Sequence, residues 1–416
     1  MMRPIESTEQ SPNPCPESVP LPKSQGAMRF PELDGLRGLA AVGVAVFHYL
    51  LAPATKLPFL DRVIRLLELT PLSLDTFFIL SGFLIGGILL RIRNAPDYYK
   101  AFYRGRALRI LPLYYVWVAL FCVLFYVARG WGLTPPQGYS GLFYLASYIF
   151  LFQSFFPDIV VSAQMLLPTW TLVVEEHFYL IIPICVRRMS TRRLVQLLLA
   201  AIVFAPLFRA VLFKYLSHRT GWADLTVYFW PPCRIDALAM GVFLAVVWRD
   251  PAMRKWVQAH ISPFRLGMFV FSGFAVLLAW MAERNLHHSR TLNAGLGRTT
   301  VELACFCLIV FLICRPQSAF GRFLCTDIMR QLGKISYCLY MVHWGVLWMI
   351  FRFVLHTRFA EHLWLDFTVA PVALLISIGI ASLSWKYIES PLLQRVRRVP
   401  QPVSLPAISD RQPQIA

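Results

Sequence analysis

The stretch from Phe30 to Leu50, FPELDGLRGLAAVGVAVFHYL, is mostly apolar, yet it carries an arginine and a histidine. Arg37 and His48 are eleven positions apart, and eleven steps of roughly 100° come to about three turns, so both side chains share one helix face, about 16 Å apart along the axis. Ionisable side chains inside a membrane span are costly and usually face a cavity or a partner. The stretch therefore predicts a membrane helix that takes part in chemistry or transport.

The composition of the 416-residue chain is typical of a multi-pass membrane protein, because 57% of the residues are hydrophobic and only 15% are charged. An apolar piece at 141–156 is followed by Pro157, and its short length favours an interfacial or re-entrant segment. We therefore predict an all-α, polytopic membrane protein of about ten transmembrane helices. The runs long enough to cross about 30 Å of hydrocarbon are 35–53, 71–90, 110–128, 169–186, 193–214, 233–249, 264–282, 299–315, 334–355 and 367–388.

The net charge of +18 could indicate a nucleic-acid partner, but the distribution of the charge indicates membrane topology instead. With ten spans and the N-terminus inside, the cytoplasmic connections and tails carry 25 of the 40 Lys and Arg, whereas the opposite loops carry ten. By the positive-inside rule both termini are cytoplasmic. We expect a protein of the cell (inner) membrane, with the lipid bilayer and no nucleic acid among its partners.

Pro-rich polar segments flank the apolar part of the chain. Residues 1–29 and 399–416 are predicted to be disordered cytoplasmic tails, and 30–398 to form one membrane domain. No internal repeat of fixed period is visible, which weakens the interpretation as an inverted-repeat transporter. The nine cysteines form no CxxC pair, and those in apolar runs are expected to pack as small apolar side chains.

The charged groups of the first helix suit two different roles. Asp34 and Arg37 lie three residues apart at the expected cytoplasmic mouth, and His48 lies near the outer end. A histidine can act as a base near neutral pH, or accept an acyl group transiently. The alternative is an interfacial histidine whose ring reaches the headgroups, with the arginine anchoring the other end.

A basic cluster precedes the third span, in YYKAFYRGRALRILPLYY. Arg106 and Arg109 are three residues apart on one helix face, with Arg104 nearby. Guanidinium groups near a helix N-terminus suit a phosphate-rich ligand, because their planar fork meets phosphate oxygens bidentately. Anchoring by the positive-inside rule is the other interpretation.

Three further segments place polar groups in apolar surroundings. In PTWTLVVEEHFYLIIP (168–183), Glu175 and Tyr179 share a helix face, and Glu176 and His177 add ionisable groups at membrane depth. A buried carboxylate there could orient a histidine. In LSLDTFFILSGFLIGG (72–87) we expect an aspartate to cap the outer end and small residues to permit close packing, namely Asp75, Ser81, Gly82, Gly86 and Gly87. In GKISYCLYMVHW the polar residues Ser336, Tyr340 and His343 could line a cavity or bridge helices.

Together these motifs resemble the acyltransferase-3 family of integral membrane acyltransferases, over about residues 30 to 394. The resemblance implies ten spans, cytoplasmic termini, and transfer of an acyl group from cytoplasmic acyl-CoA to an acceptor on or bound for the cell surface. The matching elements, in order, are LDGLRGLAAVGVAVFHY, DTFFILSGFLI, the RxxR element followed by ILPLYY, PTWTLVVEEHFYLIIP, RIDALAMG at 234–241, GKISYCLYMVH and IESPLL.

The family's functional residues carry over onto matching positions. The Arg-x10-His element falls on Arg37 and His48, and RxxR falls on Arg106 and Arg109. Joined to the charge and chemistry of these residues, the resemblance leads us to expect that the arginines bind the polyanionic CoA and that His48 acts as base or acyl carrier, with Glu175 supporting the imidazole. The element typified by WSL-x-x-E-x-x-FY corresponds to Trp170, Thr171, Glu175, Phe178 and Tyr179.

Two departures from the family pattern matter little to this assignment. Thr171 replaces the more usual serine, and His177 stands where glutamine is more usual, so His177 receives no catalytic role.

A thioester donor needs no metal, and no ligand cluster is evident, so we expect no metal and no bound cofactor. The predicted reaction moves an acyl group, with acetyl as the first expectation, from acyl-CoA to a hydroxyl of a carbohydrate or glycolipid acceptor. A transporter or flippase for an anionic glycolipid, or a non-catalytic export scaffold, remains an alternative.

Overall fold

The computed structural model of the chain describes residues 30–54, 56–68, 74–130, 164–285, 288–357, 359 and 363–397. Within these ranges almost every residue is helical and no strand occurs, which confirms the predicted all-α class. The predicted tails, 1–29 and 399–416, and the apolar piece at 141–156 lie outside the described residues.

Nine helices of the described part are long and apolar enough to cross a membrane. Their main segments are α1 (Pro31–Ala54), α3 (Leu74–Ile92), α4 (Tyr98–Gly130), α7 (Trp170–Arg188), α8 (Thr191–Ser217), α12 (Ile261–Glu283), α14 (Arg298–Cys314), α16 (Asp327–Met349) and α17 (Leu363–Ser384). Short helical segments extend some of them: η2 (Gln164–Thr169), α13 (Ser289–Leu292), η4 (Asn293–Gly297), η5 (Ile350–Val354), η6 (Trp385–Glu389) and α18 (Ser390–Arg397). The remaining elements are α2 (Pro58–Glu68), α9 (Ala223–Phe229), η3 (Pro231–Cys233), α10 (Ile235–Arg249), α11 (Pro251–Ala259) and α15 (Ala319–Leu324).

One predicted span, 233–249, forms the shorter helix α10. Its 15 residues extend about 22 Å at 1.5 Å per residue, less than the hydrocarbon thickness. Pro231 lies in the η3 turn directly before α10, and proline is poorly accommodated inside a longer helix. α10 packs against α3 and α8 and is largely buried. Nine of the ten predicted runs therefore coincide with helices long enough to span, whereas the count of ten and the cytoplasmic termini stay predictions.

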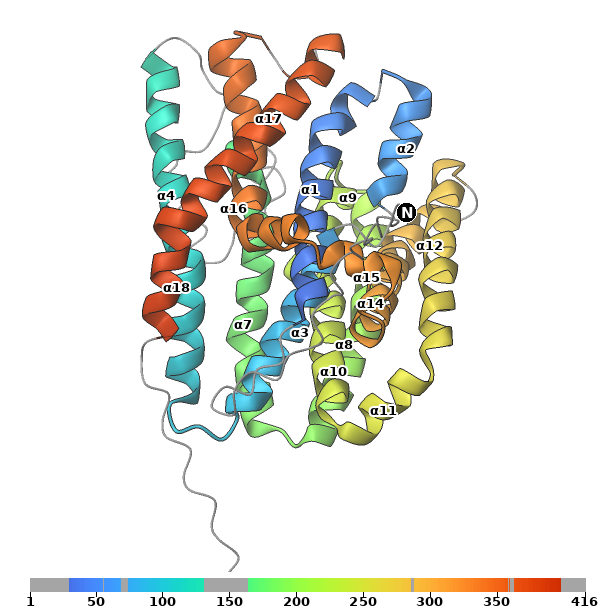
Figure 1. Cartoon of the computed structure of the whole chain (residues 1–416). Helices are drawn as coiled ribbons and strands as arrows, with labels where there is room; N and C mark the ends of the chain where they lie inside the picture. Colours follow the sequence, from blue (N-terminus) through green and yellow to red (C-terminus); the bar gives the residue numbers. More distant parts are fainter. Residues whose placement is uncertain are drawn as a thin grey trace, which may run out of the picture.

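The helices form one bundle with α1 in its interior (Figure 1). α1 packs chiefly against α16 and α17, and α3 packs along α10. The outer helices expose large apolar side chains: Val203, Leu207 and Val211 on α8 and Leu266 and Phe269 on α12 are each more than half exposed. An apolar surface of this extent is expected to face lipid rather than water. The described part of the chain thus has the form of a multi-pass membrane protein.

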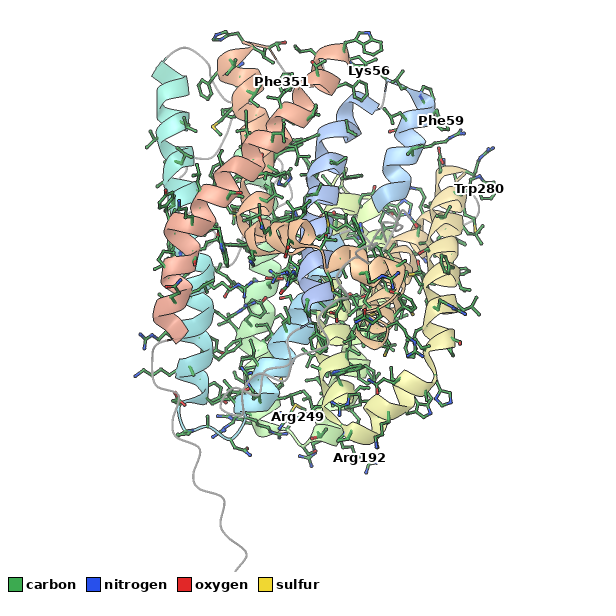
Figure 2. The ribbon with its side chains drawn as sticks, viewed as in Figure 1. Lys56, Phe59, Arg192, Arg249, Trp280 and Phe351 are labelled. Carbon is green, nitrogen blue, oxygen red and sulfur yellow. The ribbon has the colours of Figure 1, made fainter. Side chains whose placement is uncertain are left out.

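The two ends of the bundle carry different side chains. Figure 2 shows Arg192 and Arg249 at one end and Lys56, Phe59 and Trp280 at the other. The charge pattern predicts that the connections containing Arg192 and Arg249 are both cytoplasmic. The two connections lie at the same end of the bundle, as this topology requires.

Glycines allow α1 and α16 to touch along their backbones. A Cβ atom built on Gly333 would lie 2.0 Å from the carbonyl oxygen of Asp34, and one on Gly38 would lie 2.6 Å from the amide nitrogen of Gly333. Small residues of this kind let membrane helices approach closely. The contact fixes α1 against α16 and so sets which side chains meet further along the two helices.

The glycines of α3 behave as predicted at two of three positions. A Cβ on Gly82 would lie 2.1 Å from the carbonyl oxygen of Leu238, and one on Gly86 would lie 3.0 Å from the Cβ of Ala245. Their packing role against α10 is confirmed. Gly87 has no neighbouring atom within 4 Å of such a Cβ, so packing does not require a glycine there.

Candidate active site

Three of the predicted arginines come together inside the bundle from two helices. Arg37 lies on α1, and Arg106 and Arg109 lie one turn apart on α4. Their side chains are close enough for their charges to interact with one another. Like charges at short range repel, so such a cluster needs counter-charges or an anionic ligand. Among the described residues, the acidic side chains within electrostatic reach of the cluster are Asp34, Glu175, Glu176 and Glu389.

The hydroxyl of Tyr179 connects α4 and α7 at this point. It donates to Oε2 of Glu175 at 2.8 Å and accepts a hydrogen bond from Arg106, while the Ser81 hydroxyl bonds to it from α3. The Arg106 guanidinium also lies over the Tyr179 ring, 4.4 Å from its centroid. Glu175 and Tyr179 share a helix face as predicted, and together they fix the orientation of Arg106.

His48 meets a second histidine, His343 of α16. Nδ1 of His48 lies 2.8 Å from Nε2 of His343, although the two residues are far apart in the sequence. His343 is fully buried, whereas His48 is half-buried between the rings of Phe47 and Trp344. Among the described residues the partner of His48 is thus His343, and the side-chain partner of Glu175 is Tyr179. The sequence marked His343 as part of a polar stripe but assigned it no function.

A line of polar side chains connects the arginine cluster with the histidine pair. Thr171, Glu175 and Tyr179 follow at intervals of four on one face of α7, over about 12 Å. The Thr171 hydroxyl donates to the Tyr340 hydroxyl at 3.2 Å, and the Tyr340 ring lies 5.8 Å from that of His343. We call the three α7 residues with Tyr340, His343 and His48 the polar column.

Residues 30–386 match the family whose model is described as an acyltransferase domain. The chain belongs to this family. The match covers most of the chain and includes the whole arginine cluster and the whole polar column, whereas Glu389 lies just beyond it. The predicted family and the predicted enzyme class, acyltransferase, are both confirmed at this level. No solved structure matches the chain.

The relatives of this acyltransferase domain include longer proteins. "O-acetyltransferase OatA" of Staphylococcus aureus (strain NCTC 8325 / PS 47) is 24% identical over 384 residues, which cover 90% of this chain and 59% of the relative. "Putative peptidoglycan O-acetyltransferase YrhL" of Bacillus subtilis (strain 168) is 28% identical over 392 residues, covering 89% of this chain and 56% of the relative. The chain therefore spans less than two thirds of the length of these relatives.

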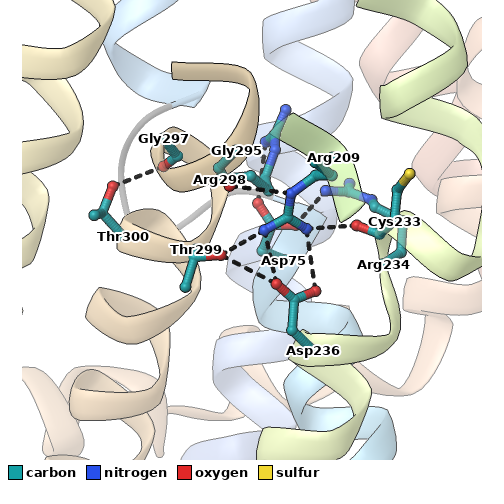
Figure 3. A network of polar contacts seen from close by, with 10 residues as sticks. All are labelled: Asp75, Arg209, Cys233, Arg234, Asp236, Gly295, Gly297, Arg298, Thr299 and Thr300. Atoms are coloured by element: carbon teal, nitrogen blue, oxygen red, sulfur yellow. Dashed lines mark hydrogen bonds and ion pairs between the residues drawn. The ribbon is translucent and has the colours of Figure 1, made fainter. Parts of the chain in front are cut away.

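A second polar network lies between α3, α8, α10 and α14 of the acyltransferase domain (Figure 3). The Arg209 guanidinium donates to both carboxylate oxygens of Asp236, at 3.2 and 2.8 Å, and both side chains are fully buried. Arg209 also donates to the carbonyl oxygens of Cys233 and Gly295 and to the Thr299 hydroxyl. Buried charges are retained when paired and hydrogen-bonded, so this network ties four helices together.

Asp75, in the first turn of α3, belongs to the same network. Its carboxylate is fully buried and forms ion pairs with Arg234 at 3.1 Å and Arg298 at 3.0 Å. Arg234 also lies over the rings of Phe78 and Tyr228. Arginines and aspartates in apolar segments need partners, so contacts of this kind could be expected from the sequence, but the pairs could not be identified from it.

The other ionisable groups noted near the site have local roles. Nδ1 of His177 donates to the carbonyl oxygen of Val173, one turn back on α7, at 2.8 Å. Arg104 is exposed, away from the inward-facing Arg106.

Proposed function

We propose that this protein transfers an acetyl group from cytoplasmic acyl-CoA to a hydroxyl of a carbohydrate on, or bound for, the cell surface. The observation that carries the proposal is the polar column, which connects a cluster of three arginines to a half-buried histidine. The names of the relatives, O-acetyltransferase and, in one case, peptidoglycan O-acetyltransferase, support acetyl as the group and a carbohydrate as the acceptor. Acetyl-CoA is accordingly the first donor to test.

The arginine cluster suits the phosphates of the donor. CoA is polyanionic, and Arg37, Arg106 and Arg109 gather positive charge at the expected cytoplasmic side of the spans. The pantetheine arm would extend along the column, so that the thioester reaches His48. The distance from Arg37 to His48 along α1 is about 16 Å, which an extended arm can cover.

His48 is the proposed general base. Its imidazole takes the proton from the acceptor hydroxyl as the oxygen attacks the carbonyl carbon of the thioester. A new C–O bond forms, the C–S bond breaks, and the imidazolium returns the proton to the CoA sulfur. The products are the acetyl ester and free CoA, and His48 returns to its neutral form.

Glu175 has a positioning role in this scheme. Its carboxylate accepts a hydrogen bond from the Tyr179 hydroxyl, and that hydroxyl accepts one from Arg106. Glu175 therefore holds in place an arginine of the site proposed for acyl-CoA. This differs from the sequence-based expectation that Glu175 supports the imidazole. The arrangement of side chains favours His343 for that function.

The test is acetyl transfer by the purified protein in lipid vesicles. Radiolabelled acetyl-CoA and soluble peptidoglycan fragments are supplied, and ester formation is measured by mass spectrometry. His48→Ala should reduce the rate by at least about 100-fold, the usual contribution of a general base. His218→Ala removes an exposed histidine at the end of α8 and should leave the rate unchanged.

Three outcomes would contradict parts of this proposal. Full activity of His48→Ala would remove His48 from the chemistry. Esters formed at the same rate without any CoA thioester would overturn the donor. Labelled acetyl trapped on His48 after rapid quenching would replace the base mechanism by an acyl-histidine intermediate.

A further inference from the structure

The histidine pair fixes which nitrogen of His48 carries a proton. We infer that His343 is a positioning residue that holds His48 in the tautomer with Nδ1 protonated and the lone pair on Nε2. The inference rests on the proposed function for its consequence, because Nε2 is then the atom that receives the acceptor proton. The tautomer itself can be tested without any transfer reaction.

The argument begins at the backbone of α16. Nδ1 of His343 lies 2.7 Å from the carbonyl oxygen of Tyr340. A carbonyl oxygen can only accept, so Nδ1 of His343 must carry the hydrogen. In a neutral imidazole the other nitrogen then has the lone pair. Nε2 of His343 is therefore an acceptor.

The same reasoning applies to the next ring. Nδ1 of His48 lies 2.8 Å from this acceptor, so Nδ1 of His48 must donate and its Nε2 keeps the lone pair. The two ring planes differ by 9°, and the centroids are 5.1 Å apart. That separation is about the N–N distance plus the two ring radii, so the rings meet edge to edge. This is the alignment that a linear N–H···N bond requires.

Packing holds His343 rigidly enough for this role. The side chain is fully buried, and its backbone carbonyl accepts the Tyr49 hydroxyl at 2.9 Å. Tyr49 adjoins His48 on α1, and its hydroxyl is also 3.2 Å from that of Ser377 on α17. Three helices thus hold the two rings in register.

A neutral hydrogen-bond acceptor for His48 suits the apolar interior of the bundle. In catalytic triads a carboxylate fixes the histidine tautomer, but an extra charge in an apolar interior is costly. His343 provides the same directional acceptor without a charge. When Nε2 of His48 takes a proton, its Nδ1–H becomes a stronger donor to His343, so the imidazolium is stabilised.

Three substitutions separate this role from simple packing. In His343→Gln the side-chain amide reaches the position of Nε2 and can accept from His48. In His343→Asn the amide has the same polarity but is one carbon too short, and in His343→Leu no acceptor remains. We expect the Asn and Leu variants to lose about ten- to hundredfold in kcat, because the productive tautomer loses its acceptor in a buried site. The Gln variant should keep at least ten times the kcat of Asn. The KM for acetyl-CoA should not change in any of them.

Nitrogen-15 spectroscopy provides the readout that a structural role would not change. Protein labelled at histidine is reconstituted in lipid, and the His48 signals are assigned by their loss in His48→Ala. The wild type should show protonated Nδ1, and His343→Leu should shift His48 toward protonated Nε2.

Each outcome decides between the positioning role and its alternatives. The inference would be overturned if Nε2 of His48 were protonated in the wild type, or if His343→Leu kept full kcat. It would also be overturned if His343→Leu lost kcat while the His48 tautomer stayed the same. A wild-type protein with the expected tautomer but no acetyl transfer would refute the proposed function and leave the positioning role intact.

Discussion

Substitution of Gly333 by alanine tests whether the contact between α1 and α16 sets the geometry of the histidine pair. The added Cβ would lie 2.0 Å from the carbonyl oxygen of Asp34, and real Cβ atoms essentially never come closer than 3.0 Å. The helices must therefore separate locally by about 1.0 Å. If α16 moves as a rigid body along the line between the two rings, the 2.8 Å bond between His48 and His343 lengthens to about 3.8 Å, which is too long for a hydrogen bond.

The expected loss of stability follows from two opposing effects. Overpacking in a well-packed core costs about 1 to 3 kcal/mol, and the upper part of that range applies because the clash is with the backbone of Asp34 rather than with a flexible side chain. Alanine returns about 0.5 to 1 kcal/mol, since glycine is a poor helix former. The net loss is about 2 kcal/mol, which lowers the unfolding temperature by about 2 to 3 °C, because an unfolding entropy of roughly 2.1 cal/mol/K per residue applies over 416 residues.

The assay compares thermal unfolding and acetyl transfer of Gly333→Ala with those of Gly87→Ala. Gly87 is exposed on α3, and a Cβ there meets no atom within 4 Å, so only the gain in helix propensity remains. We expect the Gly87 variant to be as stable as the wild type or slightly more stable, with full activity. The Gly333 variant should be less stable and at least tenfold less active. Equal unfolding temperatures and rates for the two variants would refute the proposed dependence of the histidine pair on the glycine contact.

Three further predictions concern charge. Arg106→Lys with Arg109→Lys should raise the KM for acetyl-CoA about tenfold, because an ammonium cannot reproduce the bidentate fork; kinetics in vesicles measure this. Arg209→Met should lower the free energy of unfolding by about 3 to 5 kcal/mol, since it leaves a buried carboxylate unpaired; thermal unfolding in detergent measures this. A cysteine at Arg192 should react with a membrane-impermeant reagent only from the cytoplasm and one at Lys56 only from outside, as labelling of intact cells can determine.

Matched controls separate these effects from general damage. Arg104→Lys changes an exposed side chain next to the same cluster and should leave the KM for acetyl-CoA unaltered. Arg219→Met removes an exposed guanidinium over the Tyr215 ring, and its cost should stay within about 0.5 kcal/mol. An unchanged KM in the double lysine variant would return Arg106 and Arg109 to an anchoring role.

The helical class and the membrane character could be predicted from the sequence because both depend on local patterns. Long apolar runs satisfy their own backbone hydrogen bonds as helices, whatever they pack against. The shared face of Glu175 and Tyr179 is equally local, since a separation of four is a property of one helix. The predicted run 233–249 also agrees with α10 to within two residues, since Cys233 ends the preceding turn and the helix begins at Ile235.

Partners from distant segments could not be predicted in this way. The polarity of His343 and the charges of Arg209 and Asp236 were visible in the sequence, but their pairing depends on which helices are neighbours. Glu175 illustrates the difference, because a carboxylate on a buried helix face suits an imidazole or a guanidinium equally well by chemistry alone. The distinction is made by backbone contact: α1 touches α16 at Gly38 and Gly333, so His48 faces His343. The Tyr179 hydroxyl on α7 is hydrogen-bonded to Arg106 on α4 and to Glu175, so Glu175 orients an arginine rather than the imidazole. A substitution at His343 should therefore affect His48 without changing donor binding, whereas one at Glu175 should change donor binding without affecting His48.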